Sequence, residues 1–180
     1  MPSKYNIIIC YGFFMKKILL ISDTHGFIDN DILKYVKSVD EVWHAGDIGS
    51  QEVAELIQQI KPLRAVYGNI DDQTIRADFP LDNIFNIEQV KIWITHIGGY
   101  PYRYNFRIKD ALIKNPPNLF ISGHSHILKV QYDKKLNLLH MNPGAIGKYG
   151  IHTIRTMLRF EIDGKDIKNL EVIELSKMNS

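Results

Sequence analysis

The segment Ile18-Leu19-Leu20-Ile21-Ser22-Asp23-Thr24-His25 joins a short apolar run directly to a polar cluster. A continuous apolar run of this length predicts a buried β-strand over Ile18–Ser22. Packing of that strand does not require an acid and a histidine just beyond its end. We therefore treat Asp23 and His25 as candidates for chemistry, and the strand as the element that positions them.

Four further polar clusters follow apolar runs in the same way. If the chain leaves each strand in extended geometry, side chains two residues apart face the same side. Asp23 should then face the same point as His25, and His124 the same point as His126. In open α/β sheets, binding sites form beyond the carboxyl ends of the strands. The four clusters, which bring the set to two Asp, one Asn and four His, are Gly46-Asp47, Gly68-Asn69, His96 after Thr95, and Gly123-His124-Ser125-His126.

The first half of the chain alternates predicted strands and helices. Apolar residues at helical spacing predict helices over Asn30–Val39 and Gln51–Ile60. Apolar runs predict strands over Val42–Ala45 and Leu63–Tyr67. Repeated strand–helix–strand units imply right-handed crossovers and a parallel sheet.

The second half predicts mainly strands. Asn83–Ile87 and Val90–Thr95 have the pattern of a hairpin, and Arg107–Lys114 that of a short helix. We expect mostly antiparallel pairing here, and hence an α/β fold of two packed mixed β-sheets with helices outside. Residues 15–180 should form a single domain. The remaining strands are expected at Leu119–Ser122, Leu128–Tyr132, Leu136–His140, Met157–Ile162 and Leu170–Leu175.

The composition is that of an ordinary globular protein and argues against several classes. Of the 180 residues, 45% are hydrophobic and 23% charged, and the net charge of +2 gives no case for a nucleic-acid or membrane partner. The single cysteine, Cys10, excludes an internal disulfide framework and a thiolate metal cage. It also fits a cytoplasmic location. The composition leaves open whether the protein forms a homo-oligomer.

Residues 1–14 are apolar in part, but the run is too short to span a bilayer and has no small-residue cleavage site after it. Met15 leads directly into the first predicted strand. We interpret residues 1–14 as an extension upstream of a natural start at Met15, with an additional strand as the alternative. A chain that begins at Met15 should then fold and bind metal as the full chain does.

The candidate side chains are suited to metal ions. Imidazole, carboxylate and amide ligands without sulfur favour Mn²⁺, Fe or Zn²⁺ over Mg²⁺ or Ca²⁺. Two divalent ions would carry four positive charges, and Asp23 and Asp47 would neutralise two of them. The surplus would attract an anionic phosphate ester. Two such ions, spaced about 3.5–4 Å apart, can activate a shared hydroxide for in-line displacement.

The ordered motifs resemble those of the calcineurin-like metallophosphoesterases. The ending Asn142-Pro143-Gly144-Ala145 is similar to that of the compact bacterial and archaeal phosphodiesterase branch, which is related to the retromer scaffold subunit. The resemblance covers about residues 16–175 and implies a four-layer sandwich fold. It also implies Asp23, His25 and His126 at a first metal, Asn69, His96 and His124 at a second, and Asp47 as the bridge. Asp47, Asn69 and His96 would be the catalytic residues.

Two positions depart from the family pattern. Many members carry a histidine after Gly-Asn that is proposed to protonate the leaving group, whereas this chain has Ile70. The favoured leaving group would then be acidic, or another group must donate the proton. The usual Thr-His-Gly-His run is also changed, to Thr95-His96-Ile97-Gly98.

Simpler interpretations exist for each polar residue taken singly. Asp23 could cap a turn, and Asn69 could shape one. Asp71 could either cap the same turn or orient a metal-bound histidine. His44 is expected to be a satisfied core histidine, and His140 a structural residue near the Asn-Pro-Gly turn. The joint pattern favours the metal site.

The run Tyr100-Pro101-Tyr102-Arg103-Tyr104-Asn105-Phe106-Arg107 mixes four aromatic residues with two arginines directly after His96. It could form a substrate rim in which Tyr100 stacks on an aromatic group and Arg103 pairs with a phosphate. It could instead pack on the core or form a subunit contact.

These observations predict a metal-dependent phosphodiesterase with two metal ions that hydrolyses small phosphate esters. Mn²⁺ is the expected metal, and Zn²⁺, Fe or Ni²⁺ are alternatives. A non-catalytic protein-binding scaffold of the retromer-subunit type is the alternative from another class. A phosphomonoesterase or nucleotidase would differ only in its substrate.

Overall fold

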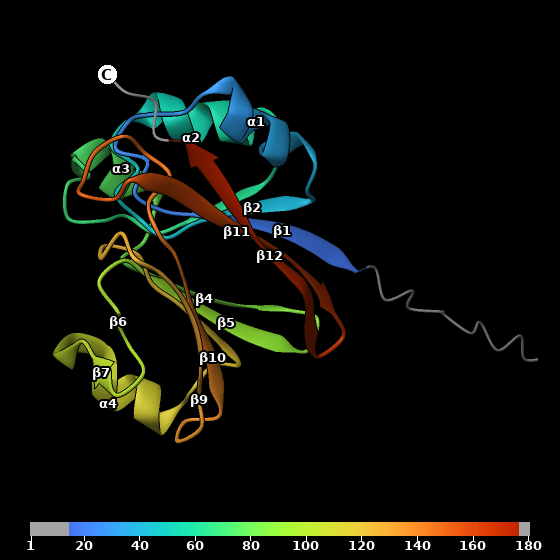
Figure 1. Ribbon diagram of the computed structural model, residues 1–180. Helices are drawn as coiled ribbons and strands as arrows, with labels where there is room; N and C mark the ends of the chain where they lie inside the picture. Colours follow the sequence, from blue (N-terminus) through green and yellow to red (C-terminus); the bar gives the residue numbers. More distant parts are fainter. Residues whose placement is uncertain (1–14, 177–180) are drawn as a thin grey trace, which may run out of the picture.

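Two five-stranded β-sheets pack face to face in the computed structural model, which describes residues 15–176 (Figure 1). The first sheet has the strand order β12-β11-β1-β2-β3, and the second has the order β4-β5-β8-β10-β9. The strands of the first sheet are β1 (Lys16–Ile21), β2 (Glu41–His44), β3 (Leu63–Ala65), β11 (Ile154–Asp163) and β12 (Asp166–Ser176). Those of the second are β4 (Asp82–Ile87), β5 (Val90–Thr95), β8 (Leu119–Ile121), β9 (Leu128–Asp133) and β10 (Leu138–Pro143).

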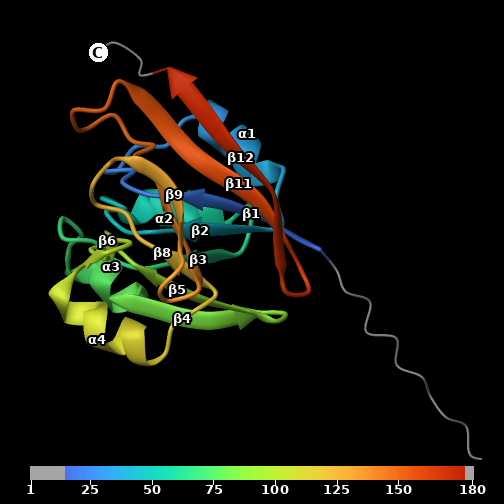
Figure 2. The same cartoon turned by 60° about the horizontal axis from the view of Figure 1, so that its bottom comes forward.

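Helices cover the outer face of each sheet (Figure 2). The helices α1 (Asn30–Lys37), α2 (Gln51–Gln58) and α3 (Gln73–Asp78) pack on the first sheet, and α4 (Phe106–Lys114) packs on the second. The main core lies between the sheets and includes buried Leu20, Trp43, Ile94 and Ile121. Helix, sheet, sheet and helix make four layers, so the predicted fold class is confirmed.

The pairing of β1, β2 and β3 is parallel, as predicted. The second half is mostly antiparallel, as expected, since β4 with β5, β9 with β10, and β11 with β12 all pair in this way. The exception is β8, which pairs in parallel with both β5 and β10. Helix α4 lies between β5 and β8 in the sequence and serves as a crossover, which requires parallel pairing. The hairpin of β11 and β12 returns to the first sheet, where β11 runs antiparallel to β1.

The sequence pattern missed three short elements. These are α3 and the two-residue strands β6 (Gly99–Tyr100) and β7 (Arg103–Tyr104). Each is too short to show a hydrophobic period. The interpretation of residues 1–14 falls outside the described residues and stays a prediction. Among the described residues, no helix is long and apolar enough to cross a membrane.

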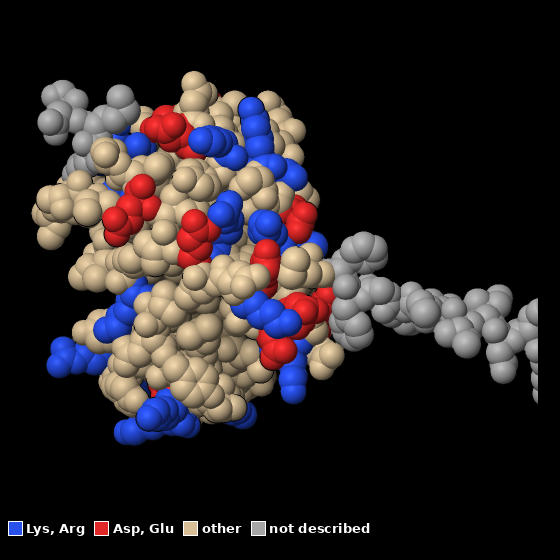
Figure 3. Space-filling view, turned by 45° about the vertical axis from the view of Figure 1, so that its right-hand side comes forward, with Lys and Arg blue, Asp and Glu red and all other residues tan. Residues whose placement is uncertain are grey.

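Charges of both signs are interspersed on the face shown in Figure 3. Several of the surface charges are paired across the β11–β12 hairpin. Arg159 contacts Glu171 at 2.6 Å, and Lys168 contacts Asp163 at the same distance. Exposed pairs of this kind contribute little to stability.

One buried carboxylate fastens the loops that follow β2 and β3. Asp71 Oδ1 accepts the N–H of Gly49 at 2.7 Å, and its Oδ2 accepts those of Ile48 at 3.1 Å and Gly68 at 2.7 Å. Asp71 is 3% exposed, so these bonds are shielded from water. All three of these contacts are with backbone N–H groups, which supports the interpretation that Asp71 caps the turn.

Replacing Asp71 with Ala should lower the free energy of unfolding by about 3 kcal/mol, because three backbone N–H groups lose their acceptor. Urea unfolding measures this loss. Asp72→Ala is the matched control, since Asp72 only accepts the N–H of Ile75 at the start of α3 and should cost about 1 kcal/mol. Hydrogen exchange of the Ile48 and Gly68 amides should accelerate in the first variant only. Equal effects of the two substitutions would contradict this role.

His44 in β2 is fully buried, and both of its ring nitrogens have partners. Nδ1 accepts the N–H of Gly46 at 3.1 Å, which leaves the proton on Nε2. Nε2 donates to the Thr24 hydroxyl at 2.8 Å, and that hydroxyl donates to Ile48 O at 2.8 Å. Burial lowers the pKa of His44 to about 4, so the ring is neutral at pH 7. The interpretation as a satisfied core histidine is confirmed.

His140 in β10 forms a similar chain from one side of its ring. The Ser122 hydroxyl donates to Gly99 O at 3.1 Å, and we therefore assign the proton of the 3.0 Å contact between Ser122 Oγ and His140 Nε2 to the ring nitrogen. Burial and the nearby charge of Lys129 lower the pKa of His140 to about 4. His140 Nδ1 has no hydrogen-bond partner within residues 15–176. The structural role expected for His140 is therefore present on one side of its ring.

The buried histidines should make the fold sensitive to mild acid. The folded pKa of His140, about 4, lies below the ordinary value of 6.5, so the unfolded chain binds the proton first as the pH falls. The contribution of the neutral His140 ring to the free energy of unfolding is complete above pH 6.5 and is lost as the pH falls toward 4. The difference in unfolding free energy between the wild type and His140→Asn should fall by about 2 kcal/mol from pH 7 to pH 5. A difference that does not change with pH would contradict a neutral buried ring.

Candidate metal centre

The seven predicted ligands gather where the carboxyl ends of five strands meet between the two sheets. They fall into two groups, and within each group the potential ligand atoms lie within 4.8 Å of one another. The first group is Asp23, His25 and His126, and the second is Asp47, His96 and His124. Asn69 joins the second group, because its Oδ1 lies 3.2 Å from His96 Nε2.

The backbone beyond the strands is not extended, so that expectation is wrong. Asp23 and His25 still belong to one group, but His124 and His126 belong to different groups. Residues in the left-handed conformation turn the chain, so side chains two residues apart no longer point to the same side as they do in a strand. Positive φ angles occur at Asp23 (56°), His25 (50°), Asp47 (55°), His124 (67°) and His126 (57°).

Backbone hydrogen bonds hold these turns in place. The N–H of Asp23 donates to Gly46 O at 3.0 Å, and the N–H of His25 donates to Asp47 O at 3.0 Å. Non-glycine residues rarely adopt positive φ, and such strain is concentrated at functional sites. The strain here falls on the residues that the motifs had singled out.

Two motif glycines are required by close approach to the ligands. Gly46 has a φ of +93°, and a Cβ there would lie 2.6 Å from His96 Nδ1. A Cβ on Gly68 would lie 2.0 Å from Asp47 Oδ1. A larger residue at either position would displace a predicted ligand, which explains why glycine precedes Asp47 and Asn69.

Asp47 lies between the two groups. Its Oδ1 is 3.2 Å from His96 Nε2, and its Oδ2 is 3.9 Å from His25 Nε2. The Ile70 N–H also donates to Oδ1, at 3.1 Å. Although burial alone would raise the pKa of Asp47, hydrogen bonding to His96 and its charge lower it below the usual value. An ionised carboxylate with one oxygen toward each group has the geometry of a bridge.

Backbone contacts orient the ligand atoms. His96 Nδ1 donates to Ala45 O at 2.8 Å, which leaves Nε2 free to face the site. Asp23 Oδ2 accepts the His124 N–H at 3.2 Å. Asp23 Oδ1 is buried, accepts no hydrogen bond within residues 15–176, and lies 3.2 Å from His126 Nε2. A buried carboxylate oxygen beside an imidazole is suited to a cation.

The histidines respond to these acids. Burial would lower the pKa of His96, but the hydrogen bond to Asp47 and the charges of Asp23 and Asp47 raise it overall. The Asp23 carboxylate beside His126 Nε2 raises the pKa of His126. Burial lowers the pKa of His124. Two imidazoles thus tend to hold a proton beside an acid, and a metal ion would displace that proton.

The nitrogen and oxygen donors therefore fit two divalent ions. Each group offers three or four ligand atoms, and Asp47 faces both groups. Sulfur is absent from the set, as expected for Mn²⁺, Fe or Zn²⁺. The assignment of ions to these residues remains our proposal.

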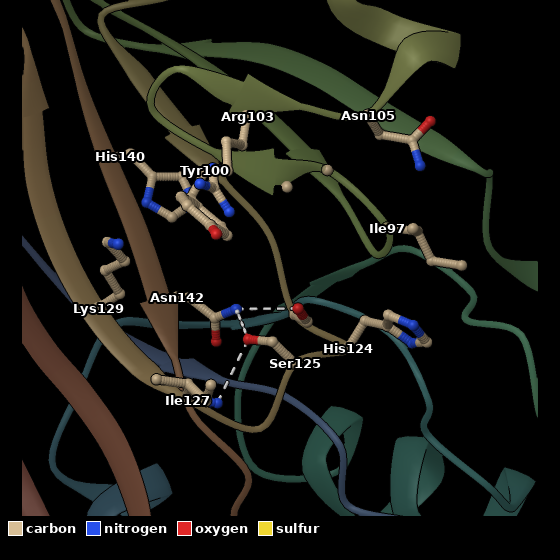
Figure 4. A pocket seen from close by; sticks show the side chains of 13 residues that line it. Ile97, Tyr100, Arg103, Asn105, His124, Ser125, Ile127, Lys129, His140 and Asn142 are labelled. Atoms are coloured by element: carbon tan, nitrogen blue, oxygen red, sulfur yellow. Dashed lines mark hydrogen bonds between the residues drawn. The ribbon is translucent and has the colours of Figure 1, made fainter.

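Some residues of the segment after β5 contact the core, and others line a pocket. Tyr104 packs on Phe120, and its hydroxyl donates to Asp133 Oδ2 at 2.7 Å. Arg107 donates to Asp82 Oδ1 at 2.9 Å. These contacts are structural. Tyr100 and Arg103 instead line a pocket that also contains His124 (Figure 4).

Two pockets adjoin the candidate metal centre. The Lys129 pocket, of about 360 Å³, contains His124 together with Tyr100, Arg103, Lys129 and His140. The Phe106 pocket, of about 540 Å³, contains Asn69 and His96 together with Tyr67, Leu81 and Phe106. Ile97 and Asn105 line both pockets.

Sequence reasoning missed the part that Asn142 plays. Asn142 Nδ2 donates to Gly123 O at 2.8 Å and to Ser125 Oγ at 3.1 Å (Figure 4). Its Oδ1 accepts the Gly144 N–H at 2.9 Å. The Asn-Pro-Gly turn thereby holds the loop that carries His124 and His126. Its position just after the strand predicted over Leu136–His140 was the available signal.

Comparisons with known proteins agree with this geometry. Residues 15–165 match the calcineurin-like phosphoesterase superfamily domain. A probable metallophosphoesterase of Methanothermobacter thermautotrophicus is 26% identical over 131 residues, which cover 70% of this chain and 74% of that protein.

Two solved structures share the fold. Vps29 of Entamoeba histolytica, complexed with Zn²⁺, has a TM-score of 0.69 and 16% identity, covering 89% of this chain and 99% of that one. A novel archaeal phosphodiesterase has a TM-score of 0.67 and 22% identity, covering 88% and 99%. Because the family domain matches most of the chain, this protein belongs to the calcineurin-like phosphoesterase superfamily.

Proposed function

We propose that this protein is a phosphodiesterase that depends on two divalent metal ions. The observation that carries the proposal is Asp47, whose two carboxylate oxygens face two separate groups of ligands. Asp23, His25 and His126 would hold one ion, and Asn69, His96 and His124 would hold the other. When bound, such ions activate water as a nucleophile and stabilise negative charge on the phosphoryl oxygens.

The chain's own residues supply charge and position. Asp23 and Asp47 contribute two negative charges against the four of two divalent ions, which leaves a site that attracts an anionic ester. The Ala45 carbonyl fixes the tautomer of His96, and the Ile70 N–H fixes Asp47. Mn²⁺ is our preferred metal. Zn²⁺, Fe and Ni²⁺ remain alternatives for the same donor set.

A diester fits the surroundings better than a monoester does. Two pockets adjoin the site, one lined in part by His124 and the other by Asn69 and His96. A phosphodiester has two ester groups, and each can enter one pocket. A monoester would use only one. A phosphomonoesterase or nucleotidase is therefore our second choice of substrate class.

Ile70 occupies the position where many family members carry the histidine that is proposed to protonate the leaving group. Ile70 is 47% exposed and has no titratable group. The side chain therefore cannot serve as a general acid. Esters with acidic leaving groups should be cleaved most readily.

A protein-binding scaffold remains a second candidate, because the chain shares its fold with Vps29. Exposed apolar side chains such as Phe106 and Ile151 would suit such a role. The complete set of seven ligands favours the enzyme. Activity measurements with and without a chelator separate the two.

Asp47→Asn and His124→Ala should each lower Mn²⁺-dependent hydrolysis of bis-p-nitrophenyl phosphate by at least about a hundredfold, since each removes a metal ligand. The wild type should hydrolyse bis-p-nitrophenyl phosphate faster than mono-p-nitrophenyl phosphate. A chelator should abolish both activities. Asp163→Asn, in the exposed pair with Lys168, is the matched carboxylate control. Wild-type rates in either ligand variant would refute the mechanism.

Metal content provides a readout that does not require turnover. Calorimetric titration should find two Mn²⁺ per wild-type chain. His124→Ala should retain one tight site, whereas Asp47→Asn should weaken both, because Asp47 faces both groups. Loss of a single site in both variants would argue against a bridging role.

Arg103→Ala should raise the Michaelis constant for bis-p-nitrophenyl phosphate more than it lowers turnover. Arg103 lines the pocket beside His124 but belongs to neither ligand group, so its charge should act on binding. Arg159→Ala on the distant β11–β12 hairpin serves as the control. Unchanged kinetics in Arg103→Ala would remove this arginine from the substrate site.

A further inference from the structure

The Lys129 pocket has an excess of positive charge. Arg103 and Lys129 both line it, and neither forms an ion pair with any residue between 15 and 176. Lys129 Nζ lies 4.2 Å from the centroid of the Tyr100 ring. Two cations without counter-ions, facing a pocket next to the candidate metal centre, favour an anionic occupant.

The same pocket contains a buried hydrogen-bond acceptor. We assign the proton of His140 to Nε2, with the Ser122 hydroxyl donating its own proton to Gly99 O. Nδ1 therefore carries a lone pair. No residue in the described part of the chain donates to it. His140 is 1% exposed, so this unused acceptor is screened from bulk water.

His44 shows that this unused acceptor is particular to His140. Both histidines donate from Nε2 to a hydroxyl that in turn donates to a carbonyl. At His44 the Gly46 N–H also satisfies Nδ1, and the ring is purely structural. At His140 the corresponding nitrogen lacks a donor while the ring forms part of a pocket wall. A buried acceptor left unpaired is costly, and a ligand donor would satisfy it.

Tyr100 adds an aromatic surface. Its side chain remains 37% exposed, and in Figure 4 it lies between His140 and Arg103. The pocket volume of about 360 Å³ falls within the range of small-molecule sites. The aromatic surface suits a nucleobase, and the lone-pair acceptor suits a hydroxyl or N–H donor. The two cations suit a phosphate.

We propose that the Lys129 pocket binds a nucleoside ester group of the phosphodiester, with His140 Nδ1 accepting a hydrogen bond from a nucleoside O–H or N–H. This inference rests on the proposed function and names its substrate class. The phosphate lies toward His124, and the nucleoside extends past Tyr100. His140 is the specificity-determining residue, because a group without a donor leaves its acceptor unpaired.

The test compares two diesters with the same p-nitrophenolate leaving group. These are p-nitrophenyl thymidine 5′-phosphate and bis-p-nitrophenyl phosphate. Only the first carries hydroxyl and N–H donors on the retained group. The ratio of their kcat/KM values therefore reports recognition of the nucleoside, because the chemistry of the leaving group cancels.

Two amide variants separate the nitrogens of His140. His140→Gln can still donate to Ser122 but lacks a polar atom at the Nδ1 position, and His140→Asn has one there but cannot reach Ser122. Loss of one hydrogen bond should lower the ratio about tenfold in His140→Gln. In His140→Asn the ratio should stay within about threefold of wild type. Equal ratios in His140→Gln and wild type, or the larger loss in His140→Asn, would overturn the proposal.

The two lysines that lie over tyrosine rings give a matched pair for the charge. Lys129→Met should weaken both diesters. Lys135→Met should weaken neither, because Lys135 lies over Tyr102 outside the pocket. An equal effect of the two substitutions would count against the pocket.

Failure of the proposed function is distinguishable from failure of this inference. If the wild type cleaves neither diester, the phosphodiesterase proposal fails. Calorimetric titration with thymidine 5′-phosphate in the presence of chelator then decides the inference. A dissociation constant about tenfold higher for His140→Gln than for wild type would support it. Equal constants, or no binding to the wild type, would overturn it.

Discussion

The strained turns beyond the strands are the constraint on which the rest of the structure depends. Five of the seven predicted ligands have left-handed backbone angles, at a cost of about 1–2 kcal/mol each. The total is comparable with the whole stability of a typical domain. It must be offset by the packing of the two sheets, whose shared core includes fully buried Leu20, Ile94 and Ile121. The four-layer architecture is therefore the support that lets polar residues occupy conformations they would otherwise avoid.

The order of the motifs carried enough information to predict the four layers and to place all seven candidate ligands at strand ends. That part was predictable because buried strands read as apolar runs and their ends are fixed by the chain. The geometry past each end was not, because Asp23 and His25 could have continued the strand as easily as turned. Backbone contacts such as Asp23 N–H to Gly46 O, made between distant segments, decide that outcome.

The sequence also did not determine which strands pair with each other, or in which direction. The residues of β8 describe a buried strand equally well beside any neighbour, and only α4, as a crossover from β5, determines that the pairing is parallel. The role of Asp71 likewise depends on two loops that meet in space. Its neighbour Asp72 has the same chemistry yet only begins a helix. Residue type alone does not separate the two.

The two buried histidines show how the fold separates structure from recognition. Each is neutral, and each uses one nitrogen in the same kind of hydrogen-bond chain. His44 lies behind the loop that carries Asp47, where a second partner makes it inert. His140 lies at the wall of a pocket, where the second nitrogen has no partner in the described chain. Because the candidate metal ligands are other residues, the proposed selectivity for the ester group could change at His140 without altering the residues proposed to hold the ions.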